Sequence, residues 1–396
     1  MNEQTLQVEV LIVGLGPAGA ACGMALARSG VNVLALDRAH FPRDKICGDA
    51  LPLNAQRLIQ HLEVTAQTKP NQRRSRLQEF GSARARLHHL GETSRGWQRD
   101  GDTVVSAQAC LQTVRRLDLD QWLVERCRER QLPMQFGWQV ETLRWIESSQ
   151  CWEVSGRIRC REGVTTDRFA ITTPLVVACD GASSTIRKQC RTHAAGALKA
   201  IASRCYWPSR QPGLPTVDDA PLSRLHYRWP GEATYAWAFA VPGGFNCGVA
   251  TMVHRDGTLP HQGRELIART REWIKALQPD LGPCDQPMPA IQTMAIPVLH
   301  PTPEPSAPAG ILFTGDAASL VDPHQGHGID RALESGALAA MVILQGKEDD
   351  VAAAVVCRRY EQRLAIRLQR WRRHWQDLDR EELNDAELEQ ALRLNL

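Results

Sequence analysis

Three glycines and one aspartate near the start of the chain have the residue types and spacing needed to bind a dinucleotide. Gly14, Gly16 and Gly19 follow the apolar run 8–13 in the spacing G-x-G-x-x-G, and Asp37 ends the next apolar run. In such a motif the first glycine permits a tight turn, the second lets the backbone approach a pyrophosphate, and the third lets helix and strand pack closely. The aspartate accepts hydrogen bonds from ribose hydroxyls. These residues predict a site for a nucleotide diphosphate.

The elements that must position these residues form a strand–helix–strand unit. Residues 8–13 and 31–36 predict buried parallel strands, and a stretch rich in alanine and leucine that begins with Pro17 and Ala18 predicts the helix between them. The N-terminus of that helix offers free backbone N–H groups and a partial positive charge to a diphosphate. A glycine-rich turn with a structural role is the alternative, but the flanking strands and the terminal acid favour the nucleotide site.

Two later strand ends carry the same combination of glycine and acid. Asp180 and Gly181 follow the apolar run 175–178, and Gly315 and Asp316 follow the run 311–313. The carboxyl ends of parallel strands meet at one edge of an open sheet, so we expect these turns to converge on one ligand. The loop after the third turn adds five candidates for the cofactor site: Pro323, Gly326, His327, Gly328 and Ile329.

The three motifs together resemble the FAD-binding signature of the aromatic-hydroxylase class, the p-hydroxybenzoate hydroxylase-like flavoproteins. That class also includes geranylgeranyl reductases and flavin-dependent halogenases. The resemblance covers residues 8–60, 104–200 and 295–345. It implies FAD as the cofactor. It also implies NAD(P)H as a transient reductant, because no second nucleotide-binding strand–helix–strand unit is visible. We predict that FAD is bound without a covalent link, because no histidine or cysteine stands in an obvious attachment motif.

Two further stretches resemble elements of this class and extend the candidate site. Residues 116–123 resemble its R-x-x-[FL]-D-x-x-L element, in which the arginine, here Arg116, helps to hold the flavin. Residues 45–51 resemble the K-x-C-G-[DE]-x-L element of the geranylgeranyl reductase branch and place Lys45 and Cys47 beside the cofactor. The resemblance implies that Asp316 holds a ribityl or ribose hydroxyl. Asp37, with its neighbour Arg38, completes the predicted cofactor site.

Two residues are candidates for a catalytic role. His327 stands in the glycine turn where many relatives have glutamine or glutamate, so it could tune the flavin or donate to oxygen or substrate; a solvent-exposed loop histidine is the alternative. We expect it to titrate near neutral pH. A thiol such as Cys47 is inert unless its pKa is lowered, so proximity to the flavin is better supported than direct catalysis. Asp180 is expected either to pack its turn or to lie near the path of the reducing nucleotide.

The segments between the cofactor motifs predict a second domain. The fold class is α/β, with a Rossmann-like FAD-binding domain, an inserted, mostly antiparallel β-sheet substrate domain and a C-terminal helical region. The predicted ranges are 1–60, 104–200 and 295–345 for the FAD-binding domain, 61–103 and 201–294 for the substrate domain, and 346–396 for the helical region. Alternation of apolar and polar residues in 224–229 and 235–241 indicates half-buried antiparallel strands.

Composition fits a globular enzyme. The chain has 396 residues, 43% of them hydrophobic, and a net charge of +3, which gives no indication of a nucleic-acid binder. No apolar run is long enough for a membrane span, and no signal-peptide pattern begins the chain. The 12 cysteines lack C-x-x-C pairs and are expected to be reduced thiols in a cytoplasmic protein. No metal-binding pattern is evident.

These observations favour an FAD-dependent monooxygenase that is fed by NAD(P)H and acts on an aromatic or hydrophobic substrate. Two alternatives stay open: a geranylgeranyl-type reductase of double bonds, and a flavoprotein that modifies tryptophan in a partner protein during maturation of a quinone cofactor. Halogenation is disfavoured because residues 237–242 lack the second tryptophan and the isoleucine–proline step of the halogenases. Arginines crowd the predicted C-terminal helix opposite an apolar stripe of Leu364, Leu368, Trp371, Trp375 and Leu378. They form a solvated face, or a docking surface for an acidic protein partner or a membrane surface.

Overall fold

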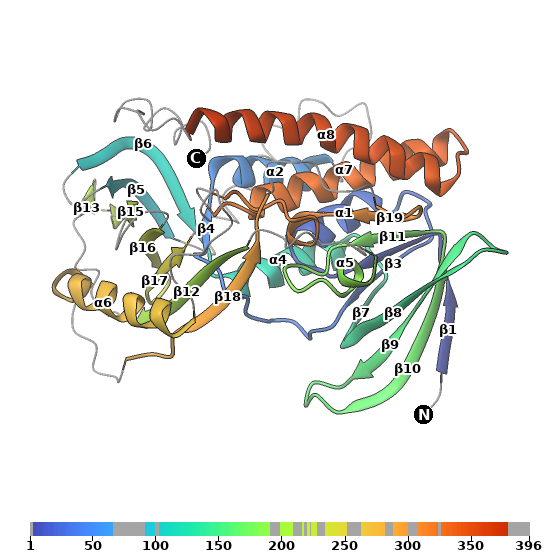
Figure 1. Cartoon of the computed structure of the whole chain (residues 1–396), viewed down its shortest axis with the longest axis horizontal. Helices are drawn as coiled ribbons and strands as arrows, with labels where there is room; N and C mark the ends of the chain where they lie inside the picture. Colours follow the sequence, from blue (N-terminus) through green and yellow to red (C-terminus); the bar gives the residue numbers. More distant parts are fainter. Residues whose placement is uncertain are drawn as a thin grey trace.

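The computed structural model arranges the chain in stacked layers of helices and sheets (Figure 1). It describes residues 3–65, 92–99, 103–190, 199–208, 216–217, 220–221, 223–227, 234–251, 263–281, 288–299, 307–323 and 326–378. The predicted fold class is confirmed: a parallel sheet of the Rossmann type, a separate and mostly antiparallel sheet, and helices near the C-terminal end.

The central parallel sheet has the strand order β19-β11-β2-β3-β7. Its strands are β2 (Val10–Val13), β3 (Val33–Asp37), β7 (Met134–Phe136), β11 (Leu175–Ala178) and β19 (Ile311–Phe313). All residues of β2, β3, β11 and β19 are buried, which explains why their sequences are nearly continuous apolar runs. The predicted strand ends at Asp37, Asp180 and Gly315 therefore belong to one sheet.

Helices cover one face of this sheet. They are α1 (Pro17–Leu26), α2 (Leu53–Thr65), α4 (Arg116–Glu129) and α7 (Ile329–Glu348). In α7, a Cβ added to Gly336 would lie 2.1 Å from the carbonyl oxygen of Ala18, so the small residues of α7 let it press directly against α1. The first and third motifs are thereby joined at their helices.

A four-stranded sheet covers the opposite face. Its order is β1 (Glu3–Gln7), β10 (Thr165–Thr173), β9 (Cys151–Arg159) and β8 (Trp138–Ile146), with β1 parallel to β10 and the other pairs antiparallel. Leu11 and Leu36 of the parallel sheet pack with Trp138, Val154 and Phe169 in one buried cluster. This sheet closes the core from the side that the helices leave open (Figure 1).

An eight-stranded sheet lies beside these layers, in the order β18-β12-β17-β16-β15-β5-β6-β4. Its strands are β4 (Ala50–Leu51), β5 (Glu92–Arg99), β6 (Thr103–Thr113), β12 (Lys199–Pro208), β15 (Ser223–Tyr227), β16 (Thr234–Val241), β17 (Gly244–Thr251) and β18 (Gln292–Pro297). All pairs except β5–β15 are antiparallel. The sheet draws β4 and β6 from segments that we placed in the cofactor domain.

The two faces of the eight-stranded sheet have different roles. Alanines 236, 238 and 240 of β16, together with Cys205 and Trp207 of β12, pack in a cluster with Leu266 and Trp273 of helix α6 (Gly263–Leu281). Their neighbours in sequence point the other way, because side chains alternate along a strand. Tyr235, Trp237 and Phe239 thus face the cofactor domain.

The remaining elements are short, apart from the last helix. They are α5 (Thr185–Cys190), β13 (Thr216–Val217), β14 (Ala220–Pro221), the 3₁₀ turn η1 (Gly315–Ala318) and α8 (Ala353–Leu378). Leu364, Leu368 and Trp371 of α8 pack against the buried clusters, as the predicted apolar stripe requires. The last two residues of the predicted stripe, Trp375 and Leu378, have side chains that the structure does not describe. None of the described helices is long and apolar enough to cross a bilayer.

Candidate cofactor and active site

A cavity of about 320 Å³ runs from the first glycine turn to the inner face of the eight-stranded sheet. The carboxyl edge of the parallel sheet forms one side, and strands β12, β16 and β18 form the other. All three motifs line this cavity. The predicted convergence of distant strand ends on one site is therefore what the structure shows.

The glycine turn has the geometry that a dinucleotide motif requires. Gly14 has φ of +100°, and a Cβ there would lie 2.3 Å from the carbonyl oxygen of Cys179. A Cβ on Gly19 would lie 1.8 Å from the carbonyl oxygen of Gly14, so this glycine permits the helix to start against the strand. A Cβ on Gly16 would meet only Arg43, at 3.5 Å. Gly16 thus faces open space, whereas Gly14 and Gly19 are held by packing.

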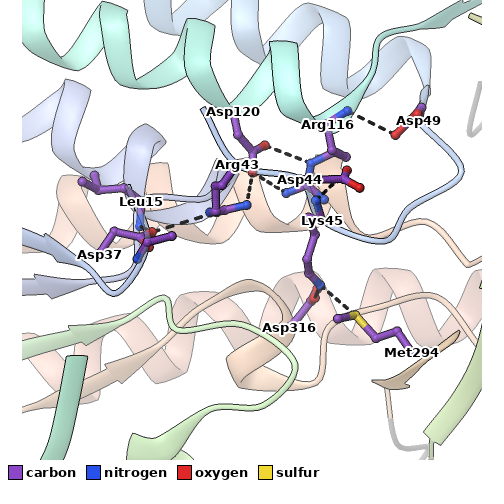
Figure 2. Close-up of polar contacts among 11 residues, drawn as sticks. Leu15, Asp37, Arg43, Asp44, Lys45, Asp49, Arg116, Asp120, Met294 and Asp316 are labelled. Carbon is purple, nitrogen blue, oxygen red and sulfur yellow. Dashed lines mark hydrogen bonds and ion pairs between the residues drawn. The ribbon is translucent and has the colours of Figure 1, made fainter. Parts of the chain in front are cut away.

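Asp37 has both carboxylate oxygens engaged with the backbone. Its Oδ2 accepts a hydrogen bond from the N–H of Leu15 at 2.8 Å (Figure 2). Its Oδ1 accepts one from the N–H of Ala39 at 2.8 Å. The side chain is buried but lines the cavity. Since a carboxylate oxygen has more than one lone pair, Asp37 can still accept from a ribose hydroxyl while it fixes the turn.

An ion-pair network links the glycine turn to helix α4. Arg43 Nη1 donates to Asp120 Oδ2 at 2.7 Å, and Arg116 pairs with both oxygens of the same carboxylate at 2.8 and 2.9 Å (Figure 2). Asp120 is fully buried. Burial acts against the charge of Arg116, but the Asp120 carboxylate, together with Cys47, acts in the opposite direction, and the net effect raises the pKa of the guanidinium. Two permanent cations are thus fixed beside the cavity.

Lys45 joins the K-x-C-G-D segment to the third motif. Its Nζ lies 3.4 Å from Asp316 Oδ2 and donates to the sulfur of Met294 at 3.3 Å (Figure 2). The backbone oxygen of Asp316 accepts a hydrogen bond from Arg187 at 2.9 Å. The side chain of Asp316 remains about one-fifth exposed, at 21%, toward the cavity. This carboxylate is therefore available to a ligand hydroxyl.

Asp180 holds the start of α5. Its Oδ1 accepts from the hydroxyl of Ser184 at 2.6 Å, and its Oδ2 accepts from the N–H groups of Thr185 and Ile186 at 2.7 and 3.2 Å. Burial raises the pKa of this carboxyl. These contacts support the packing role among the two that we expected. Gly181, with φ of +74°, lines the cavity.

The loop of the third motif places backbone groups at the far end of the cavity. Gly326 has φ of +68°, and a Cβ there would lie 2.2 Å from the hydroxyl oxygen of Tyr235. Helix α7 begins directly after Gly328, so its N-terminal N–H groups and dipole are directed toward this end. A negative charge on a reduced flavin would be stabilised there.

His327 lines the cavity and is half-buried. Burial lowers the pKa of its imidazole below the ordinary value, although Asp330 and Asp322 act in the opposite direction. We expected His327 to titrate near neutral pH, but burial moves its titration to lower pH. At neutral pH the ring is uncharged and offers one donor and one acceptor.

Cys47 lies beside the cavity as a protonated thiol. Burial raises the pKa of Cys47 despite the nearby Arg116 charge, so the reactive thiolate is disfavoured at neutral pH. The structure therefore argues against Cys47 as a nucleophile. Cys47 forms part of the wall of the cavity.

Asp49, two residues further on, ties this segment to the eight-stranded sheet. It is fully buried, has φ of +66°, and accepts hydrogen bonds from Tyr206 Oη at 2.5 Å and Asn246 Nδ2 at 2.8 Å. Asn246 in turn accepts from the indole N–H of Trp237 at 2.9 Å. Burial raises the pKa of Asp49 to about 6.

The wall opposite the cofactor motifs is aromatic. Tyr235, Trp237 and Phe239 follow one another along the inner face of β16, with ring centroids 5.7 and 6.5 Å apart. Trp237 packs closely on Gly248, where an added Cβ would be 2.2 Å from its ring. Ala202 and Arg204 of β12 continue this wall. The ring planes are tilted by 40° between Tyr235 and Trp237 and by 27° between Trp237 and Phe239, and the wall is mostly apolar.

Most of the residues that we predicted to bind the cofactor line one cavity. The predicted residues that line it are Gly14, Gly16, Pro17, Ala18, Asp37, Arg38, Lys45, Cys47, Arg116, Asp180, Gly181, Gly315, Asp316, Gly326, His327, Gly328 and Ile329. Gly19 and Pro323 do not line it; Gly19 packs the helix on the strand, and Pro323 is buried in the third loop.

Several polar residues of the site were missed. Asp120 is the aspartate of the R-x-x-[FL]-D-x-x-L element and Asp49 is the acid of the K-x-C-G-[DE]-x-L element, but neither was named as a site residue. Arg187, seven residues after Asp180, was not named either. Arg43 and Arg204 carry no such signal, because their partners are distant in sequence.

These residues fit FAD. The open side of Gly16, the free backbone N–H groups at the start of α1, and the exposed oxygen of Asp316 provide for a diphosphate and for hydroxyl groups. Within the described residues, no group of three His, Cys, Asp or Glu side chains is arranged to hold a metal ion.

Known proteins show the same architecture over most of the chain. Menaquinone reductase of Mycolicibacterium smegmatis is 28% identical over 361 residues, which cover 88% of this chain and 79% of that protein. A geranylgeranyl bacteriochlorophyll reductase-like protein of Thermoplasma acidophilum superposes with a TM-score of 0.67 at 18% identity, covering 93% of this chain and 86% of that one. PqsL of Pseudomonas aeruginosa, described as a probable FAD-dependent monooxygenase, superposes with a TM-score of 0.61 at 17% identity and covers 98% of both chains. The family model described as "FAD binding domain" matches residues 7–345, and the chain belongs to this family of FAD-dependent oxidoreductases.

Proposed function

We propose that this protein is an FAD-dependent monooxygenase that hydroxylates an aromatic substrate, with NAD(P)H as the reductant that binds transiently. The observation that carries the proposal is the aromatic wall of Tyr235, Trp237 and Phe239 opposite the cofactor motifs. Such a wall favours a planar ring, because offset stacking adds to the free energy gained from burial. Hydride addition to an aromatic ring would sacrifice its aromaticity, whereas hydroxylation preserves it. A planar substrate therefore favours oxygen chemistry.

When bound, FAD would accept hydride from NAD(P)H and supply the electrons that activate oxygen. The residues of the chain would stabilise charge, donate a hydrogen bond and exclude water. The N-terminus of α7 and the N–H groups around Gly328 stabilise negative charge at the flavin end. Neutral His327 can donate one hydrogen bond toward the reacting atoms. The buried aromatic wall excludes water from that side. Because Cys47 is a thiol with raised pKa, we propose that FAD is held without a covalent bond.

A second candidate, a reductase of carbon–carbon double bonds, is favoured by a separate observation. The whole-chain relatives include menaquinone reductase and a digeranylgeranylglycerophospholipid reductase of Methanopyrus kandleri, the latter 24% identical over 90% of this chain and 82% of that protein. A naphthoquinone ring would also suit the aromatic wall. In this case the isoprenoid chain would carry the reacting bond.

Oxygen consumption separates the two functions. The FAD-loaded protein is supplied with NADH or NADPH, and oxygen uptake is followed with a panel of bicyclic aromatic compounds and with menaquinone. The proposed function predicts that an aromatic compound stimulates NAD(P)H oxidation and oxygen uptake together, with a hydroxylated product. Substrate conversion at an equal rate without oxygen would support the reductase instead.

A further inference from the structure

Among the described residues of the aromatic wall, Arg204 of β12 is the one that carries a permanent charge. It lines the cavity beside Ala202, yet its side chain is only 1% exposed. The alternation of β12 explains its direction, because Ser203 and Cys205 on either side point toward α6. A guanidinium placed in an otherwise apolar wall is costly unless each donor has a partner.

Only one of the two terminal nitrogens of Arg204 is satisfied by the described part of the protein. Nη2 donates to Asp44 Oδ2 at 2.7 Å and to Gln292 Oε1 at 3.0 Å. Nε and Nη1 are buried and have no hydrogen-bond partner among the described residues. Since Nε carries one N–H and Nη1 carries two, three donors of a fixed cation are left over.

A stacking contact with Tyr206 also holds the guanidinium of Arg204 in place. Its guanidinium carbon lies 4.2 Å from the centroid of the Tyr206 ring, and Tyr206 is itself tied to Asp49. Asp44, which shares Nη2, is 40% exposed and faces the cavity, so water screens part of its charge. The guanidinium is thus preorganised by stacking and by two hydrogen bonds, and it retains capacity for an anionic oxygen.

We propose that Arg204 binds an anionic oxygen substituent, a carboxylate or phenolate, on the planar substrate that stacks on the aromatic wall. This inference rests on the proposed function only in that both place the substrate on this wall. The charge fixes the orientation of the ring, whereas Trp237 and its neighbours provide the affinity for the ring itself. The substrate class then narrows to aromatic acids and phenolates.

The test uses equilibrium binding to oxidised, FAD-loaded protein, so neither turnover nor oxygen enters the result. The probes are 2-naphthoate and its neutral counterpart 2-naphthamide. We expect wild type to bind the anion at least about tenfold more tightly than the amide, and Arg204→Gln to lose that preference while amide binding changes by less than about twofold. Arg204→Lys should recover only part of the preference, because a lysine cannot present the same planar donors.

A second variant, Asp44→Asn, should change the affinity for the anion in the direction opposite to Arg204→Gln. It removes the negative charge next to the guanidinium, so anion affinity should rise, by roughly threefold to tenfold. If Arg204 were a structural residue, the same substitution would loosen it and weaken binding. Flavin content and melting temperature of each variant show whether the cofactor site stays intact.

Three outcomes would overturn the proposal. Wild type binds both probes equally or neither, Arg204→Gln weakens both probes to the same extent, or the loss of binding is accompanied by loss of FAD. The last outcome would make Arg204 a flavin-binding residue. A failure of the monooxygenase proposal would leave these binding results unchanged.

Discussion

Arg43 connects Asp37 at the end of the first motif with Asp120 on helix α4. Its Nη1 lies 2.7 Å from Asp120 Oδ2, and its Nη2 lies 3.9 Å from Asp37 Oδ2. The guanidinium also forms the nearest neighbour of Gly16, where the diphosphate of FAD is expected. Arg43 therefore links the buried ion-pair network to the expected position of the diphosphate.

Replacing Arg43 by alanine should weaken FAD binding more than it weakens the fold. Asp120 keeps Arg116 as a partner, so its buried charge stays compensated. We expect the dissociation constant for FAD to rise about tenfold or more, as for loss of one charge-assisted hydrogen bond. Titration of apoprotein with FAD gives the value. Arg144→Ala, which removes a 70% exposed side chain on β8, is the control and should bind like wild type.

Valine substitutions at Gly16 and Gly19 should have different consequences. Gly16 faces open space, so Gly16→Val should fold with nearly normal melting temperature but contain little flavin. Gly19→Val should disrupt folding itself, because even a Cβ would lie 1.8 Å from the Gly14 oxygen. Flavin absorbance per folded chain and thermal melting separate the two. Normal flavin content in Gly16→Val would mean that this turn does not carry the diphosphate.

Asp49 should make stability fall as pH rises from about 4 to about 6. The carboxyl of the unfolded chain loses its proton near the ordinary aspartate pKa of 3.8, whereas that of the folded chain, with a pKa of about 6, keeps its proton longer. The folded state therefore binds more protons in this window, and deprotonation costs up to about 3 kcal/mol of unfolding free energy. In Asp49→Asn this component should be absent. Urea unfolding at several pH values measures it, and an identical pH profile in the variant would contradict the assignment.

His327 should affect the reaction of reduced protein with oxygen only at acidic pH. Its lowered pKa keeps the imidazole neutral at pH 7, so the rate of reoxidation should be flat above the ordinary histidine pKa and should change below it. His327→Gln retains a hydrogen-bond donor without titrating, and its profile should be flat throughout. Stopped-flow reoxidation from pH 5 to pH 8 provides the comparison. A transition between pH 7 and 8 that disappears in the variant would show that burial does not set this pKa.

The cofactor half of the site could be predicted from sequence because each of its motifs is local. A glycine turn, the acid at the end of the next strand and the helix between them occupy adjacent positions, so spacing alone locates Gly14, Gly16 and Asp37. The convergence of Asp180 and Asp316 followed from the rule that parallel strands end at one edge. The structure confirms this arrangement.

The substrate half could be predicted only in outline. Alternation indicated the strand that carries Trp237, but not which residues of other strands would stand beside it. Arg204 donates a hydrogen bond to Asp44, 160 residues away in the sequence, and Tyr206 donates one to Asp49, 157 residues away. No local sequence pattern predicts either pair. The sheet that holds β1, β8, β9 and β10 also went unpredicted as a layer, since the parallel pairing of β1 with β10 depends on the whole fold.

The most direct test of the proposed function is the origin of the oxygen in the product. FAD-loaded protein is reduced with NAD(P)H in the absence of oxygen, mixed with an aromatic acid or with menaquinone, and exposed to isotopically labelled dioxygen for a single turnover. The account predicts that mass spectrometry finds one labelled oxygen atom in an aromatic product, and no product in the oxygen-free control. Conversion in that control, with a product heavier by two hydrogen atoms and free of label, would contradict it.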